Sequence, residues 1–288
     1  MTAEGPVRER ESDGRRDEAT AFVPGHVTGF FSAHPDDDPA VAGSRGAGLT
    51  LSDGVRVTVE PGDRRVELDG ETCEMPPVAR VLDAMDVDAR VVVESDLPVG
   101  TGFGVSGAMA LGTALAVNAV FDGGYSENSL ITIAHRAEVA AGTGLGDVVA
   151  QARGGVPIRL EPGAPAYGEL DGIPATARVE YLSLGGLSTE DVLSGDTDRL
   201  SAAGEDALDR LVGCPTLSTF MDASRRFARD AGLLTDRVEA TVADVTASGG
   251  EASMAMLGET VFALGTGLSD AGYEATACRT HTAGATLE

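Results

Sequence analysis

The chain has 288 residues, of which 42% are hydrophobic, and this is enough to bury a large core in one or two domains. Its formal net charge is −25, so nucleic acids and anionic membranes are excluded as expected partners, because they carry charge of the same sign. No apolar run reaches the length of a membrane span and no apolar signal core opens the chain, so we expect a cytoplasmic protein.

Lysine is absent, and all 21 basic residues are arginine. Together with a sequence pI of about 4.3, few aromatic residues and much alanine and glycine, this composition favours a salt-adapted (halophilic) protein over a merely acidic one. The three cysteines (Cys73, Cys214 and Cys278) are scattered, so their spacing predicts neither a disulfide framework nor a metal site.

The first ordered part of the chain is expected to be a set of short strands. Residues 1–20 are polar and aperiodic, which predicts a disordered extension. A strand over Ala21–Val23 is expected to end at Pro24-Gly25. The alternation over Thr50–Leu68 predicts antiparallel hairpins, with a tight turn at Asp53-Gly54.

Two polar features of this region are candidates for binding. The loop Ser32–Ala42 carries His34 and Asp36–Asp38, which suit either a metal or a solvated surface; the surface is favoured, because nothing fixes these side chains on one face. Arg45 lies between small residues, so its guanidinium either binds an anion such as a carboxylate or phosphate, or pairs with a surface carboxylate of the chain.

A glycine-rich loop follows a predicted strand and precedes a predicted helix. The strand covers Arg90–Glu94, the helix covers Val105–Phe121, and Gly100, Gly102 and Gly104 lie between them. Glycines let several backbone N–H groups point at one anion, and the helix adds its positive N-terminal end. The pattern therefore predicts a phosphate site, although close packing alone is the alternative.

Two common phosphate loops fit this stretch poorly. A Walker A loop needs lysine, which the chain lacks. A dinucleotide fingerprint matches at Gly102-x-Gly104-x-x-Gly107, but that fold needs a second strand afterwards, and Ser126–Ala141 predicts a helix instead.

Two acidic residues follow the loop. Glu138 lies near the C-terminal end of the predicted helix Ser126–Ala141, where it is either a cation ligand or, as spacing alone favours, a surface residue. Asp147 follows a second glycine loop and begins a predicted helix over Asp147–Arg153, so a role as N-cap is expected, with or without a catalytic role.

A predicted strand over Val156–Leu160 and a Pro/Gly-rich stretch precede the second half of the chain. The sequence of this second half predicts strands and helices in an α+β arrangement. The expected domains are residues 21–165 and 166–288, after the extension 1–20. The predicted elements of the second half are a strand over Ala177–Leu184, helices near Leu187–Leu193, Asp198–Leu211, Thr216–Ala231 and Thr235–Ala247, and strands over Thr260–Leu264 and Glu274–Thr280.

The loop Pro98–Ala108 resembles the phosphate loop of the GHMP kinases, P-x-x-x-G-L-G-S-S-A, with Val105 in place of the first serine. This resemblance implies a two-domain α+β fold, with a mixed α/β ATP-binding domain before an α+β sandwich. It also implies Mg²⁺ shared by Ser106 and Glu138, Asp147 as the base, and a C-terminal loop at Gly249–Gly258 that reaches the phosphates. The implied ATP-binding residues are Pro98, Gly100, Gly102, Gly104, Val105, Ser106 and Gly107.

Within the GHMP kinases the chain resembles the archaeal pantoate kinases at His26–Phe31, Gly43–Gly48, Gly142–Gln151 and Ser253–Gly258. The resemblance implies ATP-dependent phosphorylation of pantoate to 4-phosphopantoate, on the archaeal route to coenzyme A. A homodimer is one assembly that we expect. The alternatives are a kinase for homoserine, mevalonate or shikimate, a dinucleotide-dependent oxidoreductase, or a non-catalytic nucleotide-binding module. The candidate substrate-binding residues are His26, Ser44, Arg45, Ser253 and Met254, with Arg45 assigned to the substrate carboxylate.

Overall fold

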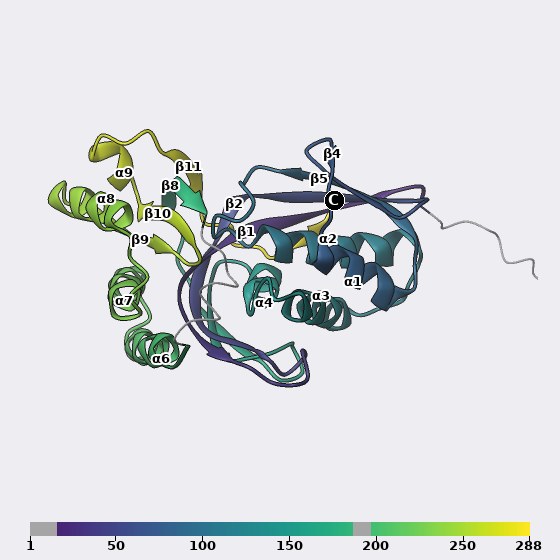
Figure 1. Cartoon of the computed structure of the whole chain (residues 1–288), viewed down its shortest axis with the longest axis horizontal. Coiled ribbons are helices and arrows are strands. Elements are labelled where there is room, and N and C mark those ends of the chain that lie inside the picture. Colours follow the sequence, from purple (N-terminus) through teal and green to yellow (C-terminus); the bar gives the residue numbers. More distant parts are fainter. Residues whose placement is uncertain (1–15, 187–196) are drawn as a thin grey trace, which may run out of the picture.

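The computed structural model describes residues 16–186 and 197–288, and two β-sheets organise them (Figure 1). The larger sheet has the strand order β12-β1-β2-β5-β3-β4, with β6 paired to β2 and β7 paired to β6; the smaller has the order β11-β8-β10-β9. The strands are β1 (Ala19–His34), β2 (Gly43–Pro61), β3 (Arg65–Leu68), β4 (Glu71–Thr72), β5 (Ala89–Ser95), β6 (Val156–Glu161), β7 (Glu169–Ile173), β8 (Arg178–Gly186), β9 (Glu251–Ala255), β10 (Gly258–Leu264), β11 (Thr276–Arg279) and β12 (Thr286–Leu287).

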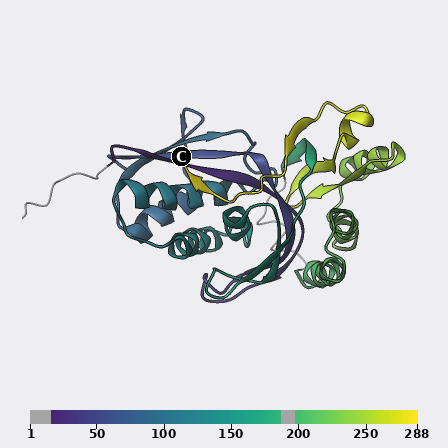
Figure 2. The ribbon, with the colours of Figure 1, turned by 180° about the vertical axis from the view of Figure 1, so that it is seen from behind.

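Helices cover the two sheets in two groups (Figures 1 and 2). In the first group, α2 and α4 pack on the larger sheet, while α1 and α3 pack against α2. In the second group, α6 and α7 also contact β1, while α7 and α8 pack against β9. The helices are α1 (Pro76–Met85), α2 (Val105–Val120), α3 (Glu127–Ala141), α4 (Asp147–Arg153), α6 (Thr197–Gly213), α7 (Leu217–Asp230), α8 (Asp236–Ala247) and α9 (Gly267–Asp270).

The predicted helices that lie within the described residues are confirmed to within two residues at each end. Their N-terminal signals explain this agreement. The side chains of Ser126, Thr216 and Thr235 each accept a hydrogen bond from the backbone N–H three residues later, at the starts of α3, α7 and α8. The helix predicted near residues 187–193 lies outside the described residues.

The strands of the first hairpin differ from the prediction. Pro24-Gly25 does not end β1 and Asp53-Gly54 does not form a turn, because the two pairs lie opposite one another inside two long strands, with Pro24 paired to Gly54. A β-carbon at Gly54 would lie 2.4 Å from Val23 O, so this glycine allows close approach of the strands rather than a turn.

The register between β1 and β2 shifts between Pro24 and His26, as in a β-bulge. β3 was expected in an antiparallel hairpin, but it pairs in parallel with β5. The acidic stretch after β1 begins later than expected, because β1 continues to His34. At the start of the chain, Ala19 and Thr20 already belong to β1, so the predicted extension reaches too far; residues 1–15 lie outside the described residues.

The end of the chain returns to the larger sheet, where β12 pairs with β1 beside the first residues of the fold (Figure 1). This short strand was not predicted. Between the two sheets, Met256 N–H donates to Thr28 O at 2.9 Å, which joins the end of β9 to the middle of β1. A division of the chain at residues 165 and 166 stays a prediction. Among the described helices, none combines the length and apolarity that crossing a membrane would require.

Candidate active site

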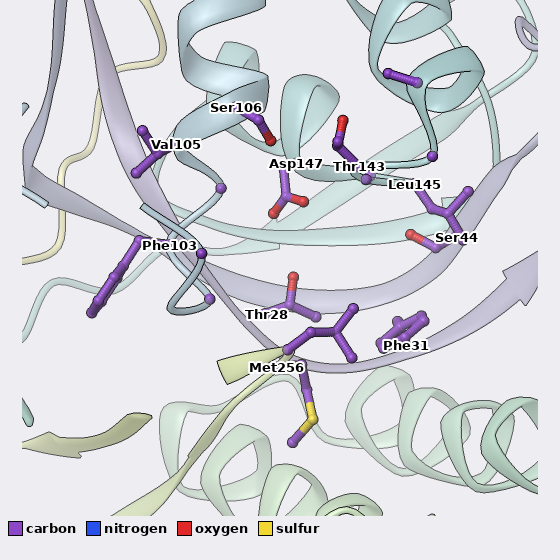
Figure 3. Close-up of a pocket in the computed structure, with 18 of the residues that line it drawn as sticks. Thr28, Phe31, Ser44, Phe103, Val105, Ser106, Thr143, Leu145, Asp147 and Met256 are labelled. Carbon is purple, nitrogen blue, oxygen red and sulfur yellow. The ribbon is translucent and has the colours of Figure 1, made fainter. Parts of the chain in front are cut away.

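A cavity of about 390 Å³ lies where the ends of α2, α3 and α4 meet β1 and the turn between β9 and β10. Polar side chains from several of these elements converge on it (Figure 3). The residues that line the cavity include Thr28, Phe31, Ser44, Gly100, Gly102, Gly104, Val105, Ser106, Thr143, Leu145, Asp147, Arg159, Met256 and Leu257.

The glycine loop forms one wall of the cavity. Gly100, Gly102 and Gly104 all have positive φ, at 75°, 92° and 64°, which residues with a β-carbon rarely adopt. Gly104 is the N-cap of α2, so the loop leads directly into the free N–H groups at the start of a 16-residue helix. These groups and the helix dipole favour a phosphate at this wall of the cavity.

Neighbouring elements hold the loop in place. The carbonyl of Gly104 accepts a hydrogen bond from Gln151 Nε2 of α4 at 2.9 Å. On the other side, Thr260 Oγ1 of β10 donates to Thr101 O at 2.8 Å. The loop is therefore held between α4 and β10.

Ser106 and Glu138, predicted as a pair, lie together. Ser106 Oγ on α2 donates to Glu138 Oε1 on α3 at 2.7 Å. Glu138 is 1% exposed, which rules out the surface position that spacing favoured, and its Oε2 is buried without a hydrogen-bond partner among the described residues. Burial raises the pKa of Glu138 to about 7, against the opposite effect of the hydrogen bond from Ser106.

Asp147 faces the cavity from the first residue of α4, beneath Ser106 and above Thr28 in Figure 3. It is not the N-cap that the sequence predicted. Gly146 occupies the cap position and no side-chain cap bond forms there. The Asp147 carboxylate contacts His26 instead, with Oδ1 at 2.7 Å from the imidazole Nδ1.

Charges around Asp147 keep its carboxylate ionised. Burial acts to raise the pKa of Asp147, but the hydrogen bond from His26 and the positive charge of Arg159 outweigh it, and the pKa is lowered. Asp147 is therefore an ionised carboxylate that is 22% exposed and opens onto the cavity.

Arg159 on β6 lines the same cavity, and the sequence analysis missed it. The residue is 2% exposed; its Nε donates to Ser44 O at 3.3 Å, and its Nη1 is buried without a partner among the described residues. Burial lowers the pKa of Arg159 to about 10, so the guanidinium is still charged at neutral pH. Its signal in the sequence is an arginine within the apolar strand Val156–Leu160.

Arg45, the predicted anion ligand, lies elsewhere. Its Nη1 pairs with Glu205 Oε2 of α6 at 2.5 Å, and its Nε donates to Leu160 O at 2.6 Å. Glu205 also accepts hydrogen bonds from Ser32 and His34. Arg45 is thus the arginine paired with a carboxylate of the chain, which was the alternative considered for it, and it does not line the cavity.

The remaining predicted site residues divide into two groups. Gly100, Gly102, Gly104, Val105, Ser106 and Ser44 line the cavity with Asp147. The other three do not line it. His26 contacts the Asp147 carboxylate from outside the cavity, and Gly107 packs near Gln151. Pro98 lines a neighbouring groove with Asp53 and Tyr181.

The C-terminal motif is placed differently from the expectation. Ser253 and Met254 lie on β9 and line a separate groove formed with α7 and α8, so they are not brought to the cavity. The predicted loop Gly249–Gly258 is largely the strand β9, because Glu251–Ala255 pairs with β10. Met256 and Leu257 reach the cavity as part of the following turn.

The acidic stretch that contains His34 and Asp36–Asp38 does not form a metal site. Within residues 16–186 and 197–288, no group of three or more His, Cys, Asp or Glu side chains could hold a metal ion. Asp36 and Asp38 accept hydrogen bonds from backbone N–H groups of their own loop. A metal near the cavity would therefore rely on ligands beyond such a cluster, for example Glu138, a hydroxyl and the phosphates of a nucleotide.

Comparisons with known proteins agree with this geometry. Residues 77–155 match the model of the GHMP kinases N terminal domain. Pantoate kinase of Methanospirillum hungatei is 36% identical over 85% of this chain and 87% of its own length. Pantoate kinase of Methanocaldococcus jannaschii is 32% identical over 84% of this chain and 91% of its own length.

A solved structure described as a phosphotransferase related to the CoA biosynthesis pathway superposes with a TM-score of 0.85. It is 31% identical and covers 94% of this chain and 98% of that chain. A more distant neighbour, mevalonate diphosphate decarboxylase of Staphylococcus aureus, has a TM-score of 0.69 at 13% identity, covers 94% of this chain and 98% of its own, and shows a shared fold. The predicted two-domain α+β fold class of these enzymes is thereby confirmed.

Proposed function

This chain belongs to the pantoate kinases, a family of the GHMP kinases, and we propose that it transfers the γ-phosphoryl group of ATP to the primary hydroxyl of pantoate. The product is 4-phosphopantoate, an intermediate on the archaeal route to coenzyme A. One observation carries the proposal: a single cavity holds a glycine loop at a helix start, an ionised carboxylate and a buried arginine whose Nη1 has no partner among the described residues.

ATP is bound through its phosphates at the glycine loop. Gly100 and Gly102–Ser106 line the cavity beside the start of α2, and the hydrogen bonds from Gln151 and Thr260 hold the loop in position. A preformed site of this kind lowers the ordering cost of binding. It also places the transferred phosphoryl group near the Asp147 carboxylate, which lies beside Gly104 of the same loop.

The donor set beside the loop fits Mg²⁺. Glu138 is a buried carboxylate whose Oε2 has no partner within residues 16–186 and 197–288, and Ser106 Oγ already donates to its Oε1. Hard oxygen ligands of this type, completed by phosphates and water, suit a small divalent cation. Ser106 and Glu138 would hold the ion, which when bound neutralises phosphate charge.

Asp147 accepts the proton of the substrate hydroxyl. An alcohol is a weak nucleophile at neutral pH, and a positioned carboxylate removes its proton as the phosphoryl group arrives. The low pKa of Asp147 makes it a weak base, which suits a loose transition state in which the proton leaves late. No lysine is available to assist, so Arg159 is the cation of the chain that faces this carboxylate.

Arg159 binds the carboxylate of pantoate. Arg159 is 2% exposed, and its Nη1 has no partner in the part of the chain that the structure describes, so the charged guanidinium gains a charge-assisted hydrogen bond when an anion enters the cavity. The substrate hydroxyl then lies toward Asp147 and the carboxylate toward Arg159. Apolar residues such as Phe31, Leu145 and Met256 complete the cavity and suit the two methyl groups of pantoate.

A kinase assay tests the proposal. Release of ADP is measured in Mg²⁺ and molar KCl with pantoate, homoserine, mevalonate or shikimate, and the phosphorylated product is identified by ³¹P NMR and mass spectrometry. Pantoate is expected to give the highest kcat/KM and a phosphomonoester at its primary hydroxyl. A higher kcat/KM with any other alcohol, or ADP release without a phosphorylated pantoate, overturns the assignment.

A further inference from the structure

His26 connects two parts of the site from behind the cavity. Its backbone N–H donates to Phe103 O of the glycine loop at 2.9 Å, and its imidazole Nδ1 lies 2.7 Å from Asp147 Oδ1. The imidazole is fully buried, whereas the Asp147 side chain is 22% exposed. One residue of β1 therefore contacts both the phosphate loop and the proposed base without lining the cavity.

The fold makes a specific place for this imidazole. The register of β1 against β2 shifts between Pro24 and His26, and a local irregularity of this kind redirects the side chain that follows it. A β-carbon at Gly48 of β2 would lie 2.2 Å from His26 Nε2, so any larger residue there would displace the ring. The glycine at this position leaves the space that the ring fills.

The buried surroundings assign the proton of the imidazole to Nδ1. Burial lowers the pKa of His26, so the ring is neutral at pH 7 and carries one N–H. Nε2 is buried and has no hydrogen-bond partner among the described residues, which would be costly for a donor. The N–H is therefore at Nδ1, and it donates to Asp147 Oδ1.

This hydrogen bond makes the two oxygens of Asp147 different. Oδ1 lies near Gly104 and is engaged by His26, while Oδ2 lies on the side of Gly144. The charged groups that face the carboxylate come from two further elements, Arg159 of β6 and Glu138 of α3, and neither is hydrogen-bonded to Oδ2 in the structure. Oδ2 is therefore the oxygen left to meet a substrate hydroxyl.

We propose that His26 is a positioning residue, which holds Asp147 by its Oδ1 so that Oδ2 faces the hydroxyl of the substrate. The proposal rests on the function proposed above and deepens it, because it assigns the basic oxygen and the group that orients it. His26 touches neither substrate nor nucleotide. Substitution of His26 is therefore expected to change kcat rather than the KM for ATP.

Three substitutions separate the hydrogen bond from the space that the ring fills. In H26N the amide N–H₂ can occupy the place of Nδ1 and donate to Asp147; H26Q places its amide near Nε2 instead, and H26L fills the volume without a donor. We expect H26N to keep kcat within about five-fold of the wild type. We expect H26Q and H26L to lower kcat about 10–100-fold, as loss of an outer-shell partner typically does, with the KM for ATP unchanged.

A double-mutant cycle with D147N checks that the effect passes through the carboxylate. Asparagine at position 147 removes the base, so H26L is expected to cost less than about two-fold in the residual turnover of D147N. The proposal is wrong if H26N and H26L lower kcat equally, or if H26L lowers kcat as much in D147N as in the wild type.

An NMR measurement tests the hydrogen bond between His26 and Asp147 independently of turnover. The chain has four histidines, so the ¹⁵N shifts of the imidazoles can be assigned by single substitutions. His26 is expected to show a protonated Nδ1 and an unprotonated Nε2, and the Nδ1 shift should move in D147N. The opposite tautomer, or an Nδ1 shift that D147N leaves in place, overturns the inference. Failure to phosphorylate pantoate, with these NMR signals present, overturns the proposed function and not the pairing.

Discussion

Arg45 and Arg159 lie on neighbouring strands and have opposite surroundings. In the pairing of β2 with β6, Gly46 lies opposite Arg159, so these two positions share one face of the sheet. Side chains alternate along a strand, and Arg45 therefore projects from the other face, toward Glu205 of α6. Ser44 projects from the same face as Arg159 and lines the cavity with it.

This contrast shows that unused hydrogen-bonding capacity indicates a binding residue better than sequence context does. Arg45 is 27% exposed and already has an acidic partner and a backbone acceptor, so it has little to offer a ligand. Arg159 is buried and has a weak backbone acceptor for Nε, and no described residue pairs with its Nη1. A buried unpaired donor is costly, and an anion in the cavity removes that cost.

Among substitutions at the cavity, D147N is expected to have the largest effect on turnover. The asparagine oxygen can still accept the hydrogen bond from His26, while its amide replaces Oδ2 and cannot accept a proton. We expect kcat to fall about 10²–10⁴-fold, with the melting temperature and the Kd for ATP close to those of the wild type. Steady-state kinetics, calorimetric melting and nucleotide titration measure the three quantities. A kcat within about three-fold of the wild type would show that Asp147 is not the base.

The second effect compares the two arginines directly. R159Q should raise the KM for pantoate about ten-fold or more, since a charge-assisted hydrogen bond is worth about 1.5–3 kcal/mol. The KM for ATP should hardly change. R45Q is the matched control on the opposite face of the sheet, and it should leave the KM for pantoate within about two-fold of the wild type. If R45Q raises that KM and R159Q does not, the assignment of the substrate carboxylate is reversed.

These two arginines also show how far sequence reasoning reaches. The helices and the glycine loops were predicted well, because capping residues and glycines act within a few residues of the chain. Ser106, Glu138 and Asp147 were predicted as site residues from the resemblance to the GHMP kinases, and the structure places all three near one cavity or on its wall.

Other features depend on contacts between distant segments. Alternation in the strand Val156–Leu160 sets Arg159 on the face opposite Ile158, which by itself suits a solvent-exposed arginine. Only the packing of that face against the cavity makes Arg159 a buried cation. For the same reason Pro24-Gly25 resembled a strand end, although Gly54 lies opposite Pro24 and lets both strands continue.

The third effect concerns the pH dependence of stability and comes from Glu138, a buried carboxyl group beside the cavity. The folded-state pKa is raised to about 7 from an ordinary value of 4.5, so the folded protein binds more protons than the unfolded chain between these values. Stability without a divalent cation should therefore fall as pH rises from about 4.5 to 7, by on the order of 1–3 kcal/mol. E138Q should remove this part of the pH dependence.

Melting temperatures across this pH range, in EDTA and at constant KCl, measure the difference between E138Q and the wild type. Added Mg²⁺ should raise the melting temperature of the wild type above pH 7 and should raise that of E138Q much less, because ligands stabilise the state they bind. Equal pH dependence in the two proteins would show that Glu138 does not titrate in this range.

The smallest effect on stability is expected at the ion pair of Arg45 and Glu205, on the face of the sheet opposite to the cavity. Both side chains are partly exposed, at 27% and 35%, and exposed ion pairs typically contribute less than about 1 kcal/mol. A double-mutant cycle of R45Q and E205Q, followed by denaturant unfolding, should therefore give a coupling energy in this range at low salt. In molar KCl, where the Debye length is about 3 Å, the coupling should approach zero.

The whole protein should respond to KCl in the opposite direction. The net charge is −25, so the many carboxylates of the chain repel one another. Screening of this repulsion by salt should stabilise the wild type, while it weakens the attraction between Arg45 and Glu205. Circular dichroism should show helix that persists in molar KCl and decays on dilution into low-salt buffer. Full stability in dilute buffer would contradict the prediction of salt adaptation. A coupling between Arg45 and Glu205 that molar KCl leaves unchanged would instead show that the pair is shielded from solvent, and the contrast between the two faces of the sheet would then be smaller than their exposures indicate.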